Sequence, residues 1–145
     1  MYLHKEETLN REEIEKLQLE RLQKTVQHCM NSAFYKKRFE ENGLTPDDIQ
    51  SLDDLKKIPF TTKQDLRDNY PFGIASVPLD KAVRLHSSSG TTGNPTVIIH
   101  TQRDLDEWAN AVARCLHMVG LRPGDVFQNS SGYGMFTGGL GFQYG

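Results

Sequence analysis

The sequence is poor in cysteine and has no long hydrophobic run, and each scarcity excludes a class of protein. The two cysteines, Cys29 and Cys115, are too few for a disulfide scaffold. Both lie in helix-like apolar settings, so we expect buried thiols in a reducing compartment. The charged stretch Met1–Glu7 is not followed by an apolar run, so we expect no signal peptide and no membrane-spanning helix. The expected location is therefore cytoplasmic.

A large excess of charge of one sign is also missing. Lysine and arginine total 17 and aspartate and glutamate total 19, which gives a formal net charge of −2. This balance argues against a nucleic-acid partner and against binding to a membrane surface. The five histidines are scattered without a close Cys or His at ligand spacing, so we expect no metal site.

The first part of the chain is predicted to be helical. Residues 10–42 carry apolar side chains close to the helical period, and Asn10 with Glu13 forms a capping-box pattern. Asn31–Ser32 marks a break between two helices, and Gly43 is the expected end of the second. We expect these helices to pack on their own domain. The alternative is a helical interaction protein that binds a partner through residues 10–42.

Short capped turns are predicted to follow. Thr45 and Ser51 each stand three residues before an aspartate, which is the pattern of a hydroxyl N-cap with an acid at N3. Thr62 is predicted to cap a short helix over 63–69. The polar residues of that helix could form a catalytic cluster, but we interpret them as a solvated face: Lys63, Gln64, Asp65 and Arg67.

The remainder of the chain has an α/β pattern. Thr101 and Asp104 form another capping box, and the helix that they open carries Trp108 on its apolar, core-facing side. We therefore divide the chain into a helical lead-in, 1–81, and the start of an α/β domain, 82–145. The predicted elements of the second part are strand, strand, helix and strand: 82–86, 96–100, 101–120 and 125–130.

The loop between the first two strands, Ser87–Pro95, begins with seven consecutive small residues. Gly90 and Gly93 permit positive φ, so successive amides can form an anion-binding nest. The loop lacks the Gly-Lys-Ser/Thr ending of a Walker loop and is not a Rossmann fingerprint. A solvated turn or linker of the same composition is the alternative. His86 and His100 flank the loop and have the chemistry for acid–base work, although strand histidines are more often structural.

Glycine is concentrated near the C-terminal end of the chain. Six of the twelve glycines fall within Gly132–Gly145. Such density is typical either of disorder or of backbone that a ligand approaches closely. The interleaved aromatic residues argue against disorder.

These motifs resemble those of the acyl-adenylating enzymes, which include acyl-CoA synthetases, firefly luciferase and peptide-synthetase adenylation domains. Ser88–Pro95 is similar to their phosphate-binding loop, Ser/Thr-Ser-Gly-Ser/Thr-Thr-Gly-x-Pro. Resemblance to the phenylacetate–CoA ligase branch extends over nearly the whole chain, through Ile58–Lys63, Gly120–Asp125 and Gly132–Gly141. Asn94 departs from that branch, which often has lysine there, so this position brings no cation to the phosphates.

The resemblance implies the N-terminal part of an AMP-forming aryl-acid–CoA ligase, inactive by itself, with the mobile C-terminal domain and its catalytic lysine outside this chain. The implied chemistry is acyl-adenylate formation followed by transfer to coenzyme A. The residues implied to bind the β- and γ-phosphates are Ser88, Ser89, Gly90, Thr91, Thr92 and Gly93. The residues implied to form the aryl-acid pocket are Tyr133, Phe136, Gly138 and Gly139, with Phe136 against the ring.

The implied cofactors are ATP, Mg²⁺ and coenzyme A. The expected partners are a small aryl acid, the remainder of the same chain and a second copy in a homodimer. Two alternatives stay open at this point. One is an adenylating enzyme that loads an aryl acid onto a carrier-protein thiol. The other is a non-catalytic fragment that binds a nucleotide or an aryl compound.

Overall fold

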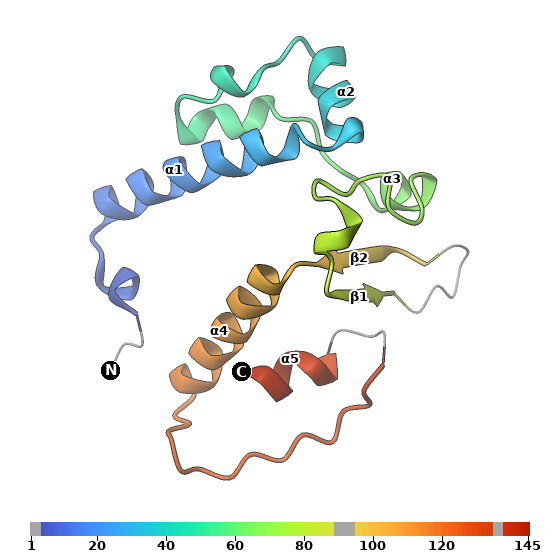
Figure 1. Cartoon of the computed structure of the whole chain (residues 1–145). Coiled ribbons are helices and arrows are strands. Elements are labelled where there is room, and N and C mark those ends of the chain that lie inside the picture. The colour runs from blue at the N-terminus through green and yellow to red at the C-terminus, as the bar shows by residue number, and fades with distance from the viewer. Residues whose placement is uncertain (1–3, 89–94, 135–137) are drawn as a thin grey trace. The chain divides into compact units, whose positions relative to one another are not determined.

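The computed structural model describes residues 4–88, 95–134 and 138–145 (Figure 1). The described chain divides into two compact units, His4–Pro78 and Leu79–Gly145. The first unit consists of helices and short 3₁₀ turns, and the second contains a two-stranded sheet with two helices. The described residues therefore have the α/β composition that the sequence predicts. No helix among them is long and apolar enough to cross a membrane.

Two capped helices open the first unit. Helix α1 spans Arg11–Cys29 and begins with a capping box. The Asn10 amide donates to the Glu13 carboxylate at 2.9 Å, and the Glu13 amide donates to Asn10 Oδ1 at 3.0 Å. Helix α2 spans Ala33–Glu41, so the predicted break is confirmed, and Gly43 follows with a φ of 62°. Only glycine adopts this backbone conformation without strain, which explains the end of the helix.

The core of this unit lies where α1, α2 and the following turns meet. Val26, Phe39 and Ile49 are buried. Four partly buried side chains pack against them: Leu22, Met30, Leu44 and Ile58. The Gln23 side-chain amide also donates to the Ile49 carbonyl at 2.8 Å, which ties the turns to α1.

The predicted capped turns are confirmed as 3₁₀ turns at Pro46–Asp48 and Leu52–Lys57. Thr45 donates to the Asp48 carboxylate through its backbone N and its Oγ1, both at 2.7 Å. Ser51 does the same to Asp54, both at 2.8 Å. Each aspartate thus satisfies backbone donors that the first turn leaves unpaired.

Helix α3 spans Lys63–Asp68 and begins at the predicted Thr62 cap. The interpretation of its polar residues as a solvated face is wrong for Asp65. The Asp65 carboxylate pairs with Arg38 of α2 at 2.7 Å, and its side chain is only 19% exposed. This ion pair joins α2 to α3, so Asp65 has a structural role within the unit.

The second unit is built on an antiparallel hairpin. Strand β1, Arg84–Ser87, pairs with strand β2, Val97–His100. The register places Arg84 opposite His100 and Ser87 opposite Val97. Helix α4, Gln102–Met118, follows β2 through the predicted Thr101 capping box. Gly120, with a φ of 106°, follows this helix as predicted.

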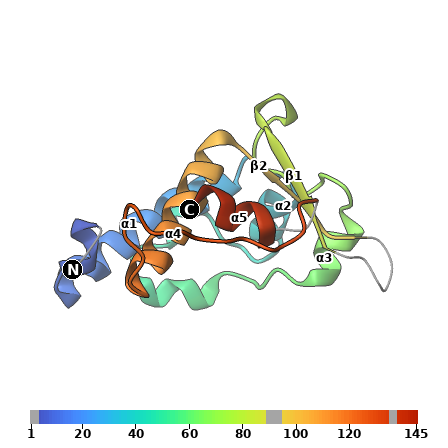
Figure 2. The same cartoon turned by 90° about the horizontal axis from the view of Figure 1, so that it is seen from below.

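The segment after α4 differs from the prediction. Residues 125–130 form no strand, because no described strand lies beside them to accept and donate ladder hydrogen bonds. A helix that the sequence did not indicate, α5, spans Gly138–Tyr144 and lies beside α4 in both views (Figures 1 and 2). Glycine is a poor helix former, so packing on α4 rather than intrinsic propensity explains α5.

The two thiols have different environments. Cys29 is partly buried, and burial raises the pKa of its thiol. Cys115 of α4 is exposed, so the prediction that both thiols are buried is wrong for this residue.

Candidate functional site

The hairpin holds together the two ends of the predicted phosphate-binding loop. Beyond the last pair of the ladder, the Ser88 amide donates to the Thr96 carbonyl at 3.0 Å. The Thr96 amide in turn donates to Ser88 Oγ, also at 3.0 Å. Of the six predicted phosphate-binding residues, Ser88 is described at this junction. The other five lie outside the described residues: Ser89, Gly90, Thr91, Thr92 and Gly93.

The chemistry of the stem suits an anionic ligand. Ser88 Oγ accepts a hydrogen bond from Thr96, and its own O–H can still donate to a ligand oxygen. The sequence contains no aspartate or glutamate between Lys81 and Arg103, whereas Arg84 lies in β1. The first acid, Asp104, is occupied by the cap of α4. No carboxylate of the hairpin would therefore repel a phosphate.

Three aromatic rings pack the hairpin against α4. His86 lies opposite Ile98, so His86 and His100 are diagonal neighbours on one face of the sheet. Their ring centroids are 5.4 Å apart, and the Trp108 ring lies 5.4 Å from His86 and 5.6 Å from His100. The predicted core position of Trp108 is consistent with these contacts. The cluster anchors the stem of the loop on α4.

Burial limits the access of ligands to His86 and lowers the pKa of His100. His86 is only 1% exposed, so a ligand in solvent has no access to its ring. Desolvation, with a smaller contribution from His86, lowers the pKa of His100. Both effects disfavour the charged imidazolium form of His100. These observations favour the structural interpretation of the flanking histidines over acid–base work.

The predicted aryl-acid pocket is described in part. Tyr133, Gly138 and Gly139 are described, whereas Phe136 lies outside the described residues. Gly139 is buried, and a Cβ atom there would lie 2.6 Å from the Gly132 carbonyl oxygen. The backbone at Gly139 and at Gly132 can approach this closely only because residue 139 has no side chain.

The Asn129 side chain, which the sequence analysis did not single out, connects the parts of the glycine-rich segment. The Asn129 amide nitrogen donates to the Gly139 carbonyl at 2.9 Å and to the Tyr133 hydroxyl at 3.2 Å. The Tyr133 hydroxyl then donates to Gln143 Oε1 at 2.8 Å. The only signal in the sequence is an asparagine just before a glycine-rich run, which is typical of a turn and does not identify its partners.

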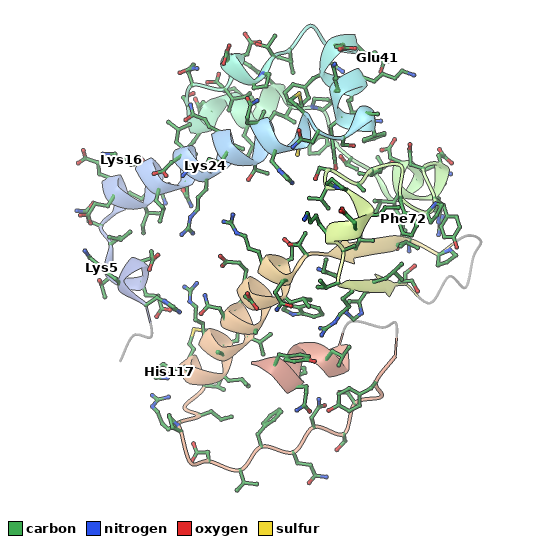
Figure 3. All side chains as sticks on the ribbon, in the orientation of Figure 1. Lys5, Lys16, Lys24, Glu41, Phe72 and His117 are labelled. Atoms are coloured by element: carbon green, nitrogen blue, oxygen red, sulfur yellow. The ribbon has the colours of Figure 1, made fainter. Side chains whose placement is uncertain are left out.

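A hollow lined by described residues of the first unit, about 380 Å³ in volume, lies between the N-terminal 3₁₀ turn, Lys5–Thr8, and α1. Its charged lining alternates in sign and includes Lys5 and Lys16, which are labelled in Figure 3, with Glu6 and Glu13. Such mixed charge favours no ligand of either sign, so we assign it no site.

The solved structures similar to this chain define its class. A crystal structure of 2-hydroxyisobutyryl-CoA ligase, in complex with 2-HIB-AMP and CoA in the thioesterification state, matches with a TM-score of 0.88 and 33% identity. The match covers 94% of this chain and 30% of that one. An open conformation of the same ligase matches with a TM-score of 0.82 and 31% identity, over 90% of this chain and 29% of the other. The chain therefore has the fold of part of an acyl-CoA ligase.

Curated relatives narrow this class. Phenylacetate-coenzyme A ligase of Escherichia coli K12 is 51% identical over 96% of this chain, and that of Thermus thermophilus is 48% identical over 100%. The chain spans 32% and 33% of these proteins, about a third of their length. No protein-family model matches the chain. The chain is a relative of the phenylacetate–coenzyme A ligases, and the resemblance predicted from its motifs is confirmed.

Proposed function

We propose that the complete gene product is an ATP-dependent, AMP-forming aryl-acid–CoA ligase that acts on phenylacetate or a related acid. The observation that carries this proposal is the identity of about half over nearly the whole chain to phenylacetate-coenzyme A ligases. In the proposed reaction, the acid's carboxylate attacks the α-phosphate of ATP and releases pyrophosphate. The CoA thiol then attacks the acyl carbon of the adenylate and releases AMP.

The loop after β1 is proposed to bind the β- and γ-phosphates. The closed stem, the donor capacity of the Ser88 hydroxyl and the lack of carboxylates in the hairpin support this role. The proposed ligands are the residues predicted from the sequence: Ser88, Ser89, Gly90, Thr91, Thr92 and Gly93. Mg²⁺ would neutralise phosphate charge. We assign none of its ligands to this chain.

The glycine-rich segment is proposed to form part of the aryl-acid pocket, through Tyr133, Phe136, Gly138 and Gly139. The close approach of backbone at Gly139 supports the proposal, since glycine leaves room for a planar ring. Coenzyme A is preferred to a carrier-protein thiol as acceptor, because a similar solved ligase was captured with CoA. The division at residue 81, the homodimer and the cytoplasmic location stay predictions.

The decisive experiment is ATP–pyrophosphate exchange by the complete gene product with a panel of aryl acids. We expect exchange that depends on phenylacetate or a close relative, followed by thioester formation when CoA is added. Exchange without a CoA thioester would indicate a carrier-protein acceptor. No acid-dependent exchange would overturn the proposal in favour of a non-catalytic binding protein.

The loop assignment has its own test. Ser88→Ala removes one donor to phosphate, so we expect the KM for ATP to rise by about five- to tenfold with the KM for the acid unchanged. Thr25→Ala is the matched control, because the Thr25 hydroxyl donates to the Arg21 carbonyl of its own helix at 2.9 Å. An equal KM for ATP in both variants would contradict the assignment of Ser88.

A further inference from the structure

The described parts of the segment from Asn129 to Gln143 are joined by hydrogen bonds, and the Asn129 side chain makes three of them. The Asn129 amide group donates one hydrogen bond to the Gly139 carbonyl and one to the Tyr133 hydroxyl. Its Oδ1 accepts from the Ser131 amide at 3.0 Å. Both donors and one acceptor of Asn129 are therefore used, and its side-chain orientation is determined by its partners.

Tyr133 is held from two sides. Its hydroxyl accepts from Asn129 and donates to Gln143 Oε1, which lies on α5. The Tyr133 side chain is about half exposed, so burial alone would leave its ring free to change rotamer. The two hydrogen bonds fix the position of the hydroxyl relative to α5.

The Asn129 side chain also fixes the backbone beside the Tyr133 ring. Gly139 approaches the Gly132 carbonyl so closely that a Cβ at 139 would lie 2.6 Å from the oxygen. Close approach alone does not hold two segments together. The bond from Asn129 to the Gly139 carbonyl supplies that attachment, within ten residues of chain.

We propose that Asn129 is a positioning residue for the acid substrate. It holds Tyr133 and the Gly139 backbone, two parts of the proposed aryl-acid pocket, in one fixed arrangement, with Gln143 supporting it from α5. This inference rests on the proposed function, which assigns the segment to an aryl-acid pocket. The role of Asn129 itself rests on the described hydrogen bonds. A group that only orients the pocket changes acid binding more than ATP binding.

Asn129→Asp is the sharpest test because it keeps the shape and removes both donors. The aspartate carboxylate can only accept hydrogen bonds, so it cannot donate to the Gly139 carbonyl. Its negatively charged oxygens would instead repel the carbonyl oxygen. In the complete gene product we expect the KM for the aryl acid to rise about tenfold, with the KM for ATP within twofold of the original. The readout is acid-dependent ATP–pyrophosphate exchange.

Asn42→Asp is the matched control. The Asn42 side-chain amide also donates to a backbone carbonyl, that of Arg38 at 2.8 Å, but in the first unit. We expect its KM for the acid to be unchanged. If Asn129→Asp does not fold, as judged by circular dichroism, Gln143→Leu and Gln143→Glu replace it. Leucine removes the acceptor for Tyr133 and glutamate keeps one, so the KM for the acid should rise more with leucine.

The outcomes separate the two proposals. Acid-dependent exchange by the original protein, with an equal KM for the acid in Asn129→Asp, overturns the positioning role and leaves the proposed function intact. A parallel rise in both KM values also overturns it, since that indicates general damage. Absence of acid-dependent exchange in the original protein overturns both proposals.

Discussion

Asp65 shows how the surroundings of a single carboxylate can differ from what its sequence context indicates. Arg38 donates to both carboxylate oxygens of Asp65, at 2.7 and 3.3 Å, and Arg38 also lies 4.6 Å from the Phe34 ring centroid. Thr62 donates to Asp65 through its amide and its hydroxyl, both at 2.7 Å. Asp65 thus caps α3 and pairs with α2 at once.

This environment predicts a pH-dependent contribution to stability. The hydrogen bonds from Arg38, then those from Thr62, lower the pKa of Asp65 to about 2. The pKa in the unfolded chain is about 3.9, so the folded state binds the proton less tightly. The stabilisation is therefore complete above about pH 4 and is lost as the pH falls towards about 2.

Asp65→Asn should accordingly lower the Tm by several degrees at pH 7, and the difference from the original chain should shrink between pH 4 and 2. Thermal melts followed by circular dichroism across this range measure both quantities. Asp53→Asn is the control, because Asp53 is largely exposed and its contact with Lys56 is 3.6 Å long. A Tm difference that stays constant down to pH 2 would contradict the argument.

At the scale of elements, the features that depend on neighbouring residues could be predicted from the sequence. Those that depend on contacts between distant residues could not. The caps at Asn10, Thr62 and Thr101 depend on residues three apart, so their pattern is visible in the sequence and the structure confirms them. Residues 125–130 follow a turn and include Val126 and Phe127, which favour a strand, but a strand also needs a partner, which the described residues do not supply. Helix α5 is glycine-rich and forms through packing on α4, so local propensity argued against it.

The packing of α5 on α4 depends on Gly141. A Cβ atom there would lie 2.8 Å from Trp108 Cζ2 and 3.0 Å from Cε2. Alanine in a helix interior is usually more favourable than glycine by about 1 kcal/mol. Here the clash with a ring that also packs on His86 and His100 outweighs that gain, at a cost of about 1–3 kcal/mol.

We therefore expect Gly141→Ala to lower the urea midpoint and to change the fluorescence of Trp108, the single tryptophan of the chain. Gly134→Ala is the control, since a Cβ there would meet no atom of the described residues within 4 Å. A Gly141→Ala variant as stable as the original, with unchanged emission, would show that α5 does not pack as described.

At the scale of the whole molecule, the sequence predicted the class of protein better than the details of its site. The loop motif at Ser88–Pro95 and the glycine-rich run are contiguous, so a resemblance can detect them. The hydrogen bonds from Asn129 to Gly139 and from Tyr133 to Gln143 each join residues ten apart, and only the return of the chain brings these residues together. Periodicity and capping rules contain no information on such contacts.

Exposed apolar side chains give the last prediction. In the second unit Met118 and Val119 at the end of α4 are largely exposed, and Val126 is 99% exposed. Surfaces of this kind are usually covered by further protein, and the curated relatives are about three times as long as this chain. We expect the 145-residue chain by itself to bind the dye ANS and to self-associate as its concentration rises.

Val126→Lys should reduce both effects because it replaces apolar surface with charge. Ser130→Lys is the matched control, since it adds the same charge to the same exposed segment without removing apolar surface. Analytical ultracentrifugation over a hundredfold range of concentration measures the association. If the two lysine variants behave alike, charge rather than apolar surface controls the association. A chain that stays monomeric and does not bind the dye would contradict this prediction, because the exposed apolar side chains would then cause no association.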